Sequence, residues 1–348
     1  MLTIGSLQLS LPAIQAALSG FSHRPMRMVA RRFGAEFCMA EVALDEHVVL
    51  RGKLRNRIFS VGPDDHPIGG QIMGSHADQL AEAADEMVAG GYDLVDINFG
   101  CPVRKVLGRC RGGFLLTEPE NALQIVKQVV AAVGGRRPVT LKMRRGYDDS
   151  PASEHAFFTI LDGAFAMGVA SITVHGRTVE QRYRGPSNWD FLARVKRHAG
   201  EHTILGSGDL FSPDAVHRML SETGVDGASV ARGAIGNPFI FREARGLLGG
   251  RAVQPPGIVE QREAIELHMA ENLALFGQEY AGPMFRKFGI AYSDLHPSPA
   301  AVRQAFIDAK TTEAVLAVLD SWYDRNRQWP AAQPRKTLSD LIAAGAER

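Results

Sequence analysis

The segment Leu-Val-Asp-Ile-Asn-Phe-Gly-Cys-Pro (94–102) shows the pattern that decides the fold. It begins as a short apolar run, ends in polar residues and then breaks at Gly100 and Pro102. After a helix-like stretch at 121–133, a second apolar run, Val-Thr-Leu-Lys-Met (139–143), repeats the pattern. Near-continuous apolar strands that alternate with amphipathic helices are typical of a parallel sheet covered by helices.

The same alternation extends in both directions from this segment. Eight strands are expected, at 11–17, 35–40, 67–73, 94–98, 139–143, 171–175, 203–207 and 227–231. Helices are expected at 77–89, 121–133, 156–167, 190–198, 213–223 and 238–247. Eight such units in about 240 residues favour a closed (β/α)8 TIM barrel over an open doubly wound sheet. The connection 41–66 is long and irregular.

The strand pattern stops after Gly249, Gly250 and the Pro-Pro-Gly turn at 255–257. Helical patterns follow at 258–276, 282–295, 299–309 and 312–323, which together predict a small helical bundle. The sequence therefore predicts a barrel domain over residues 1–250, a helical domain over residues 257–328 and a tail over residues 329–348.

The composition of the 348 residues is that of a soluble globular protein, with 45% hydrophobic and 22% charged residues. A net charge of +1 points to no particular partner, and nothing in the sequence points to a protein partner. Three cysteines do not suggest a disulfide framework, and their spacing with histidine makes no metal site. Because the sequence shows neither a signal peptide nor an apolar run of about 20 residues, we expect a cytoplasmic protein that is not bound to a membrane.

Active sites of this fold lie at the C-terminal ends of the barrel strands. Polar or charged residues stand at or near many of these ends: Ser19, Glu41, Gln71, Asn98, Cys101, Lys142, Arg144, Arg145, His175, Arg177, Asp209 and Arg232. A solvated loop or a helix cap explains any one of them equally well. Their joint occurrence predicts a site at this end of the barrel.

The last two strands end in Gly-Ser-Gly-Asp (206–209) and Ala-Arg-Gly-Ala (231–234). Glycines there let backbone N–H groups approach a phosphate at the usual phosphate position of such barrels. Two tight turns without a ligand are the alternative. Because the sequence has neither a G-x-G-x-x-G motif opening a βα unit nor a Walker-type loop, a mononucleotide such as FMN fits better than a stably bound nicotinamide dinucleotide.

Lys142 ends its strand in a place where a cation can stabilise the negative charge of a reduced isoalloxazine ring. Gln71 and His175 could hydrogen-bond to the pyrimidine edge of the same ring. The alternative for Lys142 is an ion pair with a carboxylate inside the barrel.

Cys101 is displayed by the turn that Gly100 and Pro102 force, although cysteine is usually a small buried hydrophobic residue. As a nucleophile it would need a base and an oxyanion hole, for which the sequence offers no candidates. As a general acid it needs only proximity and a protonated thiol. The basic residues that follow, among them Arg104 and Lys105, would lower the thiol pKa, so the acid role requires local screening.

The other two cysteines have simpler interpretations. Cys38 lies inside a predicted strand and is expected in the core, and Cys110 lies incidentally in the basic loop.

Further arginines stand in the predicted loops at this end: Arg144, Arg145, Arg177, Arg182 and Arg184, with Tyr183 between the last two. Positive charge with an aromatic ring suits a polyanion that has bases to stack. Ordinary solvated arginines are the alternative, and Arg136–Arg137 does lie at the opposite end of the barrel.

The chain resembles the tRNA-dihydrouridine synthases from about residue 11 to residue 325. The resemblance is carried by five motifs: Asp-Ile-Asn-Phe-Gly-Cys-Pro-Val-Arg-Lys-Val (96–106), Thr-Leu-Lys-Met-Arg (140–144), Thr-Val-His-Gly-Arg-Thr (173–178), Gly-Ser-Gly-Asp (206–209) and Ala-Arg-Gly-Ala-Ile-Gly-Asn-Pro (231–238). Phe-Arg-Lys-Phe (285–288) resembles part of the RNA-binding domain of that family. The chain departs from the family pattern at 16–20, at Ser207 and at Ala231.

The resemblance implies a role for each matching position. Cys101 matches the catalytic proton donor. The positions that match FMN contacts are Ala17, Leu18, Ser19, Gln71, Lys142, His175, Ser207, Gly208, Asp209, Ala231 and Arg232. Asn98 and Arg177 match positions near the uracil, and Arg104 and Lys105 are expected to contact the RNA substrate.

The activity implied is the reduction of specific uridines in tRNA, or alternatively rRNA, to 5,6-dihydrouridine. Hydride would pass from flavin N5 to uracil C6, Cys101 would protonate C5, and NADPH would reduce the flavin beforehand. The uridine must be flipped out of its stack to reach the flavin. The alternatives are a small-molecule flavin reductase of the dihydroorotate or dihydropyrimidine dehydrogenase type, and an RNA-binding relative that has lost reduction.

Overall fold

The structure, a computed structural model, describes residues 1–50 and 52–330, and it divides into two compact units. The first unit holds residues 1–20, 36–209 and 218–230, and the second holds 21–35, 210–217 and the described residues from 231 to 330. Most of the predicted tail, 331–348, lies outside the described residues. The domain boundaries at 250 and 257 stay a prediction.

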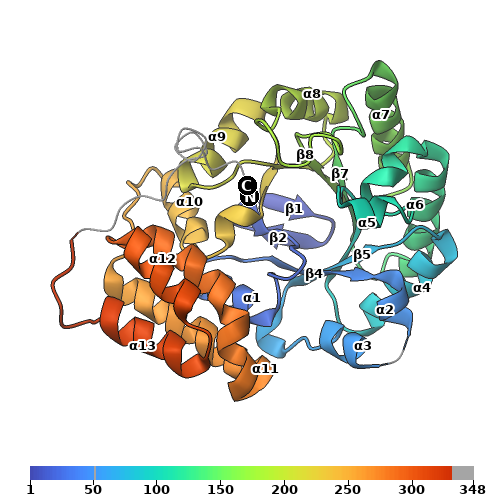
Figure 1. The fold of residues 1–348 in the computed structure, drawn as a ribbon. Helices are drawn as coiled ribbons and strands as arrows, with labels where there is room; N and C mark the ends of the chain where they lie inside the picture. The colour runs from blue at the N-terminus through green and yellow to red at the C-terminus, as the bar shows by residue number, and fades with distance from the viewer. Residues whose placement is uncertain (51, 331–348) are drawn as a thin grey trace. The chain divides into compact units, whose positions relative to one another are not determined.

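A closed parallel barrel of eight strands forms the first unit (Figure 1). The strands are β3 (Ala13–Gln15), β4 (Cys38–Leu44), β5 (Ile68–Met73), β6 (Leu94–Phe99), β7 (Val139–Arg144), β8 (Ser171–His175), β9 (Ile204–Ser207) and β10 (Gly227–Val230). They follow one another in chain order, and β10 pairs with β3 to close the ring. The predicted TIM barrel is confirmed, and each predicted strand position holds a strand.

The strand β4 differs most from its prediction, because it begins at Cys38 and continues to Leu44 instead of ending at 40. Its register against β5 shifts between Met39 and Val42. An irregularity of this kind inserts extra residues into a strand and breaks the period of two on which the prediction depends.

The register of β5, β6 and β7 sets which side chains share a row. Gln71 pairs with Asp96, and Asp96 pairs with Thr140. One step along, Ile72, Ile97 and Leu141 are fully buried apolar neighbours. Because alternate residues of a strand point to opposite faces, polar residues occupy one face of these strands and apolar residues the other.

The six helices predicted from the alternation are present: α4 (Ala77–Ala89), α6 (Pro119–Val133), α7 (Pro151–Ala166), α8 (Trp189–Ala199), α9 (Pro213–Thr223) and α10 (Ile240–Leu248). α7 begins five residues earlier than predicted. Its cap explains the difference, because the hydroxyl of Ser150 accepts a hydrogen bond from the N–H of Ser153 and proline occupies the first turn.

Periodicity did not reveal the short elements. The strands β1 (Leu2–Ile4) and β2 (Leu7–Leu9) form an antiparallel hairpin. Its apolar residues join a buried cluster with Phe37, Leu94 and Leu205 of the barrel. Three residues are too few for a period to be read, so the hairpin was missed. The helices α1 (Arg24–Arg32), α2 (Asp45–Val49), α3 (Lys53–Ile58) and α5 (Arg104–Leu107) were missed as well, and all but α1 have no more than six residues.

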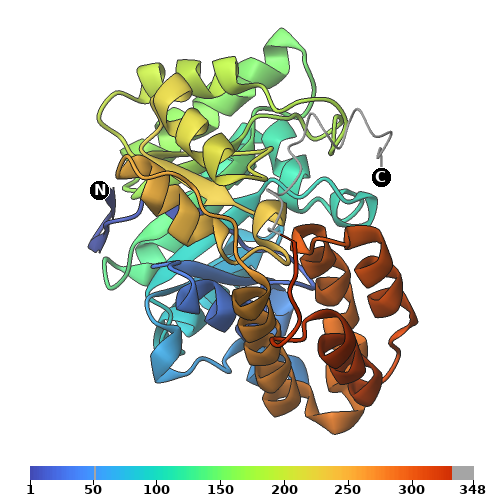
Figure 2. The ribbon, with the colours of Figure 1, turned by 90° about the vertical axis from the view of Figure 1, so that its left-hand side faces the viewer.

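The second unit contains the predicted C-terminal helices (Figure 2). They are α11 (Ile258–Tyr292), α12 (Pro299–Asp308) and α13 (Thr312–Trp322), which contact one another. Gly277 interrupts α11 with a left-handed φ of 76°, so the chain runs there as two helices, as predicted. Phe285, Phe288 and Phe306 are fully buried between the helices.

Within residues 1–50 and 52–330, no helix combines the length and apolar character that a membrane crossing requires.

We expect the hairpin to contribute to the stability of the barrel. Ile4 is 2% exposed within the cluster described above, so Ile4→Ala should lower the free energy of unfolding by about 2–5 kcal/mol in urea denaturation. Thr3→Ala, at an exposed position of the same strand, is the control and should change it by less than about 0.5 kcal/mol. Equal effects of the two variants would contradict a packing role for the hairpin.

Candidate active site

The loop after β6 holds Cys101 in a defined position. The side-chain oxygen of Asn98 accepts hydrogen bonds from the backbone N–H of Gly100 at 2.9 Å and of Cys101 at 3.1 Å. The carbonyl of Cys101 accepts a third bond from Gly113 at 3.0 Å. Gly112 has φ +60°, and a Cβ there would lie 2.8 Å from that of Cys101. The loop 112–113 therefore packs against the cysteine with no room for a side chain at 112.

The thiol of Cys101 is partly buried, and burial is the main reason that its pKa is raised above the usual value. A hydrogen bond from the backbone of Val103 and the charges of Arg144 and Lys142 act in the opposite direction, with smaller effects. The thiol is therefore protonated at neutral pH, as a general acid requires.

The basic loop beside Cys101 is partly neutralised. Arg111 approaches Glu46 at 3.3 Å and the buried Asp45 at 3.8 Å, both at the start of α2. Arg104, Lys105 and Arg109 remain exposed, and none of them is among the groups that shift the pKa of the thiol. The raised pKa of the thiol therefore comes from its burial and not from the ion pairs of Arg111.

Lys142, on β7, brings a cation to the same end of the barrel. Its pKa is lowered to about 8, mainly by burial and also by the charge of Arg144, while Asp96 and Cys101 act to raise it. Within the described chain, 1–50 and 52–330, its ammonium group forms no hydrogen bond. Lys142 lines a cavity in the barrel together with Gln71, Asp96 and Thr173. A ligand at the C-terminal end of the barrel strands that accepts hydrogen bonds would satisfy the ammonium group.

Gln71 and Asn98 are joined in one chain of hydrogen bonds. The amide nitrogen of Gln71 donates to Asp96 at 2.6 Å, and its oxygen accepts from the amide nitrogen of Asn98 at 2.7 Å. The other oxygen of Asp96 accepts from the hydroxyl of Thr140 at 2.6 Å. Each amide retains a second N–H for a ligand, because one bond uses only half of its donors.

His175 and Arg177 lie at the end of β8. The backbone N–H of Arg177 donates to Nδ1 of His175 at 3.1 Å, so a neutral imidazole carries its proton on Nε2. The side chain of Arg177 is 1% exposed and binds the carbonyl of Gly185 and both carboxylate oxygens of Asp209, at 2.6 and 2.8 Å.

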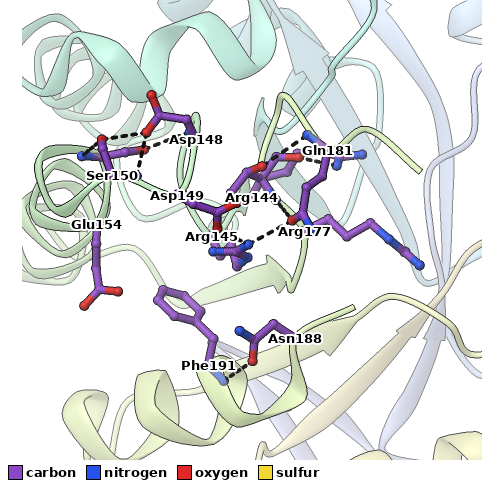
Figure 3. Close-up of polar contacts among 12 residues, drawn as sticks. Arg144, Arg145, Asp148, Asp149, Ser150, Glu154, Arg177, Gln181, Asn188 and Phe191 are labelled. Carbon is purple, nitrogen blue, oxygen red and sulfur yellow. Dashed lines mark hydrogen bonds and ion pairs between the residues drawn. The ribbon is translucent and has the colours of Figure 1, made fainter. Parts of the chain in front are cut away.

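Arg144 and Arg145 also bind partners within the protein, and Figure 3 shows them together with Gln181 of the loop after β8. Arg144 donates to the carbonyls of Gly100, Thr178 and Arg182 at 2.9, 2.8 and 2.7 Å. It thereby links the Cys101 loop to the loop after β8. Arg145 binds the side chains of Gln181 and Asp149. These two arginines and Arg177 hold the rim loops together.

The basic rim is therefore smaller than the sequence indicated. Arg184 and Tyr183 are exposed and Arg182 is partly so, whereas the other three arginines predicted for the rim have protein partners. Sequence spacing could not distinguish the two groups, because the partners of the buried arginines are mostly backbone carbonyls.

Ser207, Gly208 and Asp209 follow one another at the end of β9. Ser207 is buried, and Gly208 has φ +119°, with space for a Cβ blocked by Ser187 Oγ at 2.4 Å. Asp209 adopts a left-handed φ of 62°, which is uncommon for a residue with a side chain. Its carboxylate is neutralised by Arg177 and also accepts the N–H of Ser187. The backbone here is tightly constrained.

The remaining predicted flavin positions lie in two places. Ala17, Leu18 and Ser19 follow β3 in the first unit, where Glu41 accepts the N–H of the next residue, Gly20. Ala231 and Arg232 follow β10 and belong to the second unit, in which Arg232 lies over the ring of Phe211.

The sequence interpretation missed Asp96 and Thr140. Asp96 opens the motif at 96–106 but received no role from the sequence. A charged residue inside an apolar strand is itself a signal, because burial of a carboxylate without partners is costly.

Comparison with families of known proteins shows to which family this chain belongs. The model described as dihydrouridine synthase (Dus) matches residues 14–327. The chain belongs to the dihydrouridine synthase family. The resemblance inferred from the five motifs is thereby confirmed.

Members of this family include similar proteins from several bacteria. The protein named tRNA-dihydrouridine synthase B of Xanthomonas axonopodis pv. citri (strain 306) is 34% identical over 323 residues, which cover 92% of this chain and 95% of that protein. A protein of Rickettsia typhi (strain ATCC VR-144 / Wilmington) named probable tRNA-dihydrouridine synthase is 32% identical over 332 residues, with 92% and 99% covered.

Solved structures with little sequence similarity share the fold. A 2-naphthoyl-CoA reductase complex with 2-naphthoyl-CoA matches with a TM-score of 0.57 at 12% identity, covering 98% of this chain and 71% of that chain. Morphinone reductase, in complex with tetrahydroNAD, matches with a TM-score of 0.53 at 13% identity, covering 73% and 91%. At these identities the likeness shows the common barrel.

We expect Arg144 to control how accessible Cys101 is. Arg144→Lys keeps the charge but lacks the planar guanidinium group whose Nε and Nη1 bind carbonyls of two loops. Loss of one charged hydrogen bond, about 1.5 kcal/mol, would raise the open fraction of the loop roughly tenfold. Iodoacetamide should therefore alkylate Cys101 about tenfold faster, measured by mass spectrometry in a Cys110→Ala background. The exposed Arg109→Lys is the control. An unchanged rate in Arg144→Lys would show that Arg144 does not hold this loop.

Proposed function

We propose that this protein reduces specific uridines in tRNA to 5,6-dihydrouridine, with FMN as cofactor and NADPH as reductant. Family membership supports the reaction, and relatives carry the name tRNA-dihydrouridine synthase. The single observation that carries the proposal for this chain is that a partly buried thiol and a partly buried cation lie at the same strand ends, because Asn98, whose side chain binds the N–H of Cys101, pairs in register with Lys142.

The residues at the barrel mouth suit FMN. Lys142 offers an ammonium group without a hydrogen-bond partner among residues 1–50 and 52–330, and Gln71 retains a second amide N–H. In this proposal His175 offers Nε2–H, and the backbone at 207–209 contacts the phosphate. Ala17, Leu18 and Ser19 contact the flavin from the end of β3. Once reduced, the bound flavin supplies the hydride that is added to C6 of uracil.

Cys101 acts as the general acid of this reaction. Addition of hydride at C6 leaves negative charge on C5 and the C4 carbonyl, and the thiol transfers its proton to C5. A protonated thiol is needed for this step, and burial keeps it protonated. The hydrogen bonds that Asn98 and Gly113 make to the loop hold the thiol in one place, so no reorganisation is required when the substrate binds.

Lys142 provides positive charge on the flavin side. Below a pH of about 8 its ammonium group is charged and stabilises negative charge on the reduced ring. Above that pH the charge is progressively lost, so the contribution of Lys142 falls as the pH rises through 8.

The RNA is held outside the barrel. Arg104 and Lys105, both exposed beside the Cys101 loop, contact phosphates near the flipped uridine. In this proposal Arg177 acts on the uracil indirectly, because its guanidinium group already binds Asp209 and Gly185. Asn98 approaches the uracil with the second N–H of its amide.

RNA from a strain that lacks the gene should have lost dihydrouridine at one or more tRNA positions, detected as a mass decrease of two hydrogens per site. A plasmid with the wild-type gene should restore the modification, and so should one with Cys110→Ala, whose thiol is exposed outside the proposed site. Unchanged dihydrouridine in all tRNA, with loss in rRNA or in no RNA, would contradict the tRNA assignment.

With purified protein, Cys101→Ala should bind FMN and be reduced by NADPH at the wild-type rate. Reduction of uridine in a tRNA transcript should be slower by about 10²- to 10⁴-fold, because only the proton donor has been removed. Stopped-flow absorbance of the flavin measures the first step, and mass spectrometry of the tRNA measures the second. Full turnover by Cys101→Ala would refute the proton-donor role.

A further inference from the structure

Asp96 is a buried carboxylate that no step of the proposed reaction uses. It is 4% exposed on β6, where it pairs in register with Gln71 on one side and Thr140 on the other. Two residues further along the same strands, Asn98 pairs with Lys142. Since side chains two residues apart share a face, Asp96 lies in the row directly below Asn98 and Lys142.

The hydrogen bonds of Asp96 determine how the amide groups of Gln71 and Asn98 are oriented. An ionised carboxylate only accepts hydrogen bonds, so Gln71 must turn its amide nitrogen toward Asp96 and its oxygen toward Asn98. Asn98 must then turn its nitrogen toward Gln71 and its oxygen toward the backbone N–H of Cys101. One buried charge thus sets the orientation of two amides and reaches the loop of the proposed proton donor.

The charge of Asp96 also acts on Lys142. The groups that influence the pKa of Lys142 are Arg144 on its own strand, Asp96, and Cys101 beyond β6, while His175 ends the neighbouring strand β8. The charge of Arg144 disfavours the protonated state of Lys142, and the carboxylate of Asp96 favours it. Burial raises the pKa of Asp96, and the hydrogen bonds from Thr140 and Gln71 and the charge of Lys142 act to lower it and so favour the ionised carboxylate.

We infer that Asp96 is a positioning residue of the site, whose buried negative charge orients the amides of Gln71 and Asn98 and faces the ammonium group of Lys142. Asp96 touches neither the flavin nor the uridine in this view and acts through these three side chains. The inference rests on the proposed function only for its effect on uridine reduction, because the hydrogen bonds of Asp96 and Gln71 involve residues of this chain alone.

The test titrates Lys142 in flavin-free protein by nuclear magnetic resonance of carbon-13-methylated lysines, with the signal assigned from Lys142→Met. The wild-type midpoint should lie near pH 8. Asp96→Asn keeps the shape and removes the charge, so the midpoint should fall by about one unit or more. Asp93→Asn, which removes the charge of a carboxylate just before β6 that is not among the groups acting on the pKa of Lys142, is the matched control and should change the midpoint little. An unchanged midpoint in Asp96→Asn would overturn the inference.

The reciprocal variant does not depend on the folding of Asp96→Asn. In Lys142→Met the carboxylate loses the cation that faces it, so Asp96 should take up a proton at neutral pH. The infrared difference spectrum between Lys142→Met and the wild type should then show a new protonated-carboxyl band. A spectrum without this band would mean that the two charges are not coupled.

The reaction itself supplies a separate readout. In flavin-loaded protein, the alkaline decline of uridine reduction should move to lower pH in Asp96→Asn and stay in place in Asp93→Asn. If the protein reduced no uridine at all, the proposed function would fail while the lysine titration and the infrared spectrum would still decide the role of Asp96. If uridine were reduced with an unshifted profile, the role assigned to Asp96 would fail alone.

Discussion

The register of β5, β6 and β7 is the constraint on which the site depends. It aligns Gln71, Asp96 and Thr140 in one row and brings Asn98 opposite Lys142 in the next. A slip of one residue would turn these polar side chains to the helix-facing side and bring Ile97 and Leu141 inward. The apolar residues therefore enforce the register, because their burial against the helices is lost in any other pairing.

A polar barrel interior is stable only when its groups have partners, and this requirement makes the site rigid. Asp96 is satisfied by a hydroxyl and an amide, and the same amide continues the chain toward Cys101. Arg144 and Arg177 serve a similar purpose at the rim, where they bind carbonyls of loops that have no regular structure. The groups that orient the proposed proton donor are thus the ones that stabilise the fold around it.

Long elements could be predicted from the sequence and short ones could not. The helix α4 was predicted with its observed bounds, because thirteen residues give a clear period. The hairpin of β1 and β2 has three residues in each strand, and its existence depends on contacts with residues up to Leu205. Similarly, Cys101 and Lys142 could be placed at strand ends from the sequence alone, whereas Asp96 appeared to be one more residue of a buried strand.

The sequence by itself determined the barrel, the family and the residue types at the mouth, because apolar periodicity and local motifs are properties of neighbouring positions. Only the tertiary structure decided which charges are available and which are bound. Arg104 and Arg177 look alike in the sequence, but one is exposed and the other is buried against Asp209. The protonation of Cys101 likewise depends on burial of the thiol in a loop against which 112–113 packs, and only folding brings these segments together.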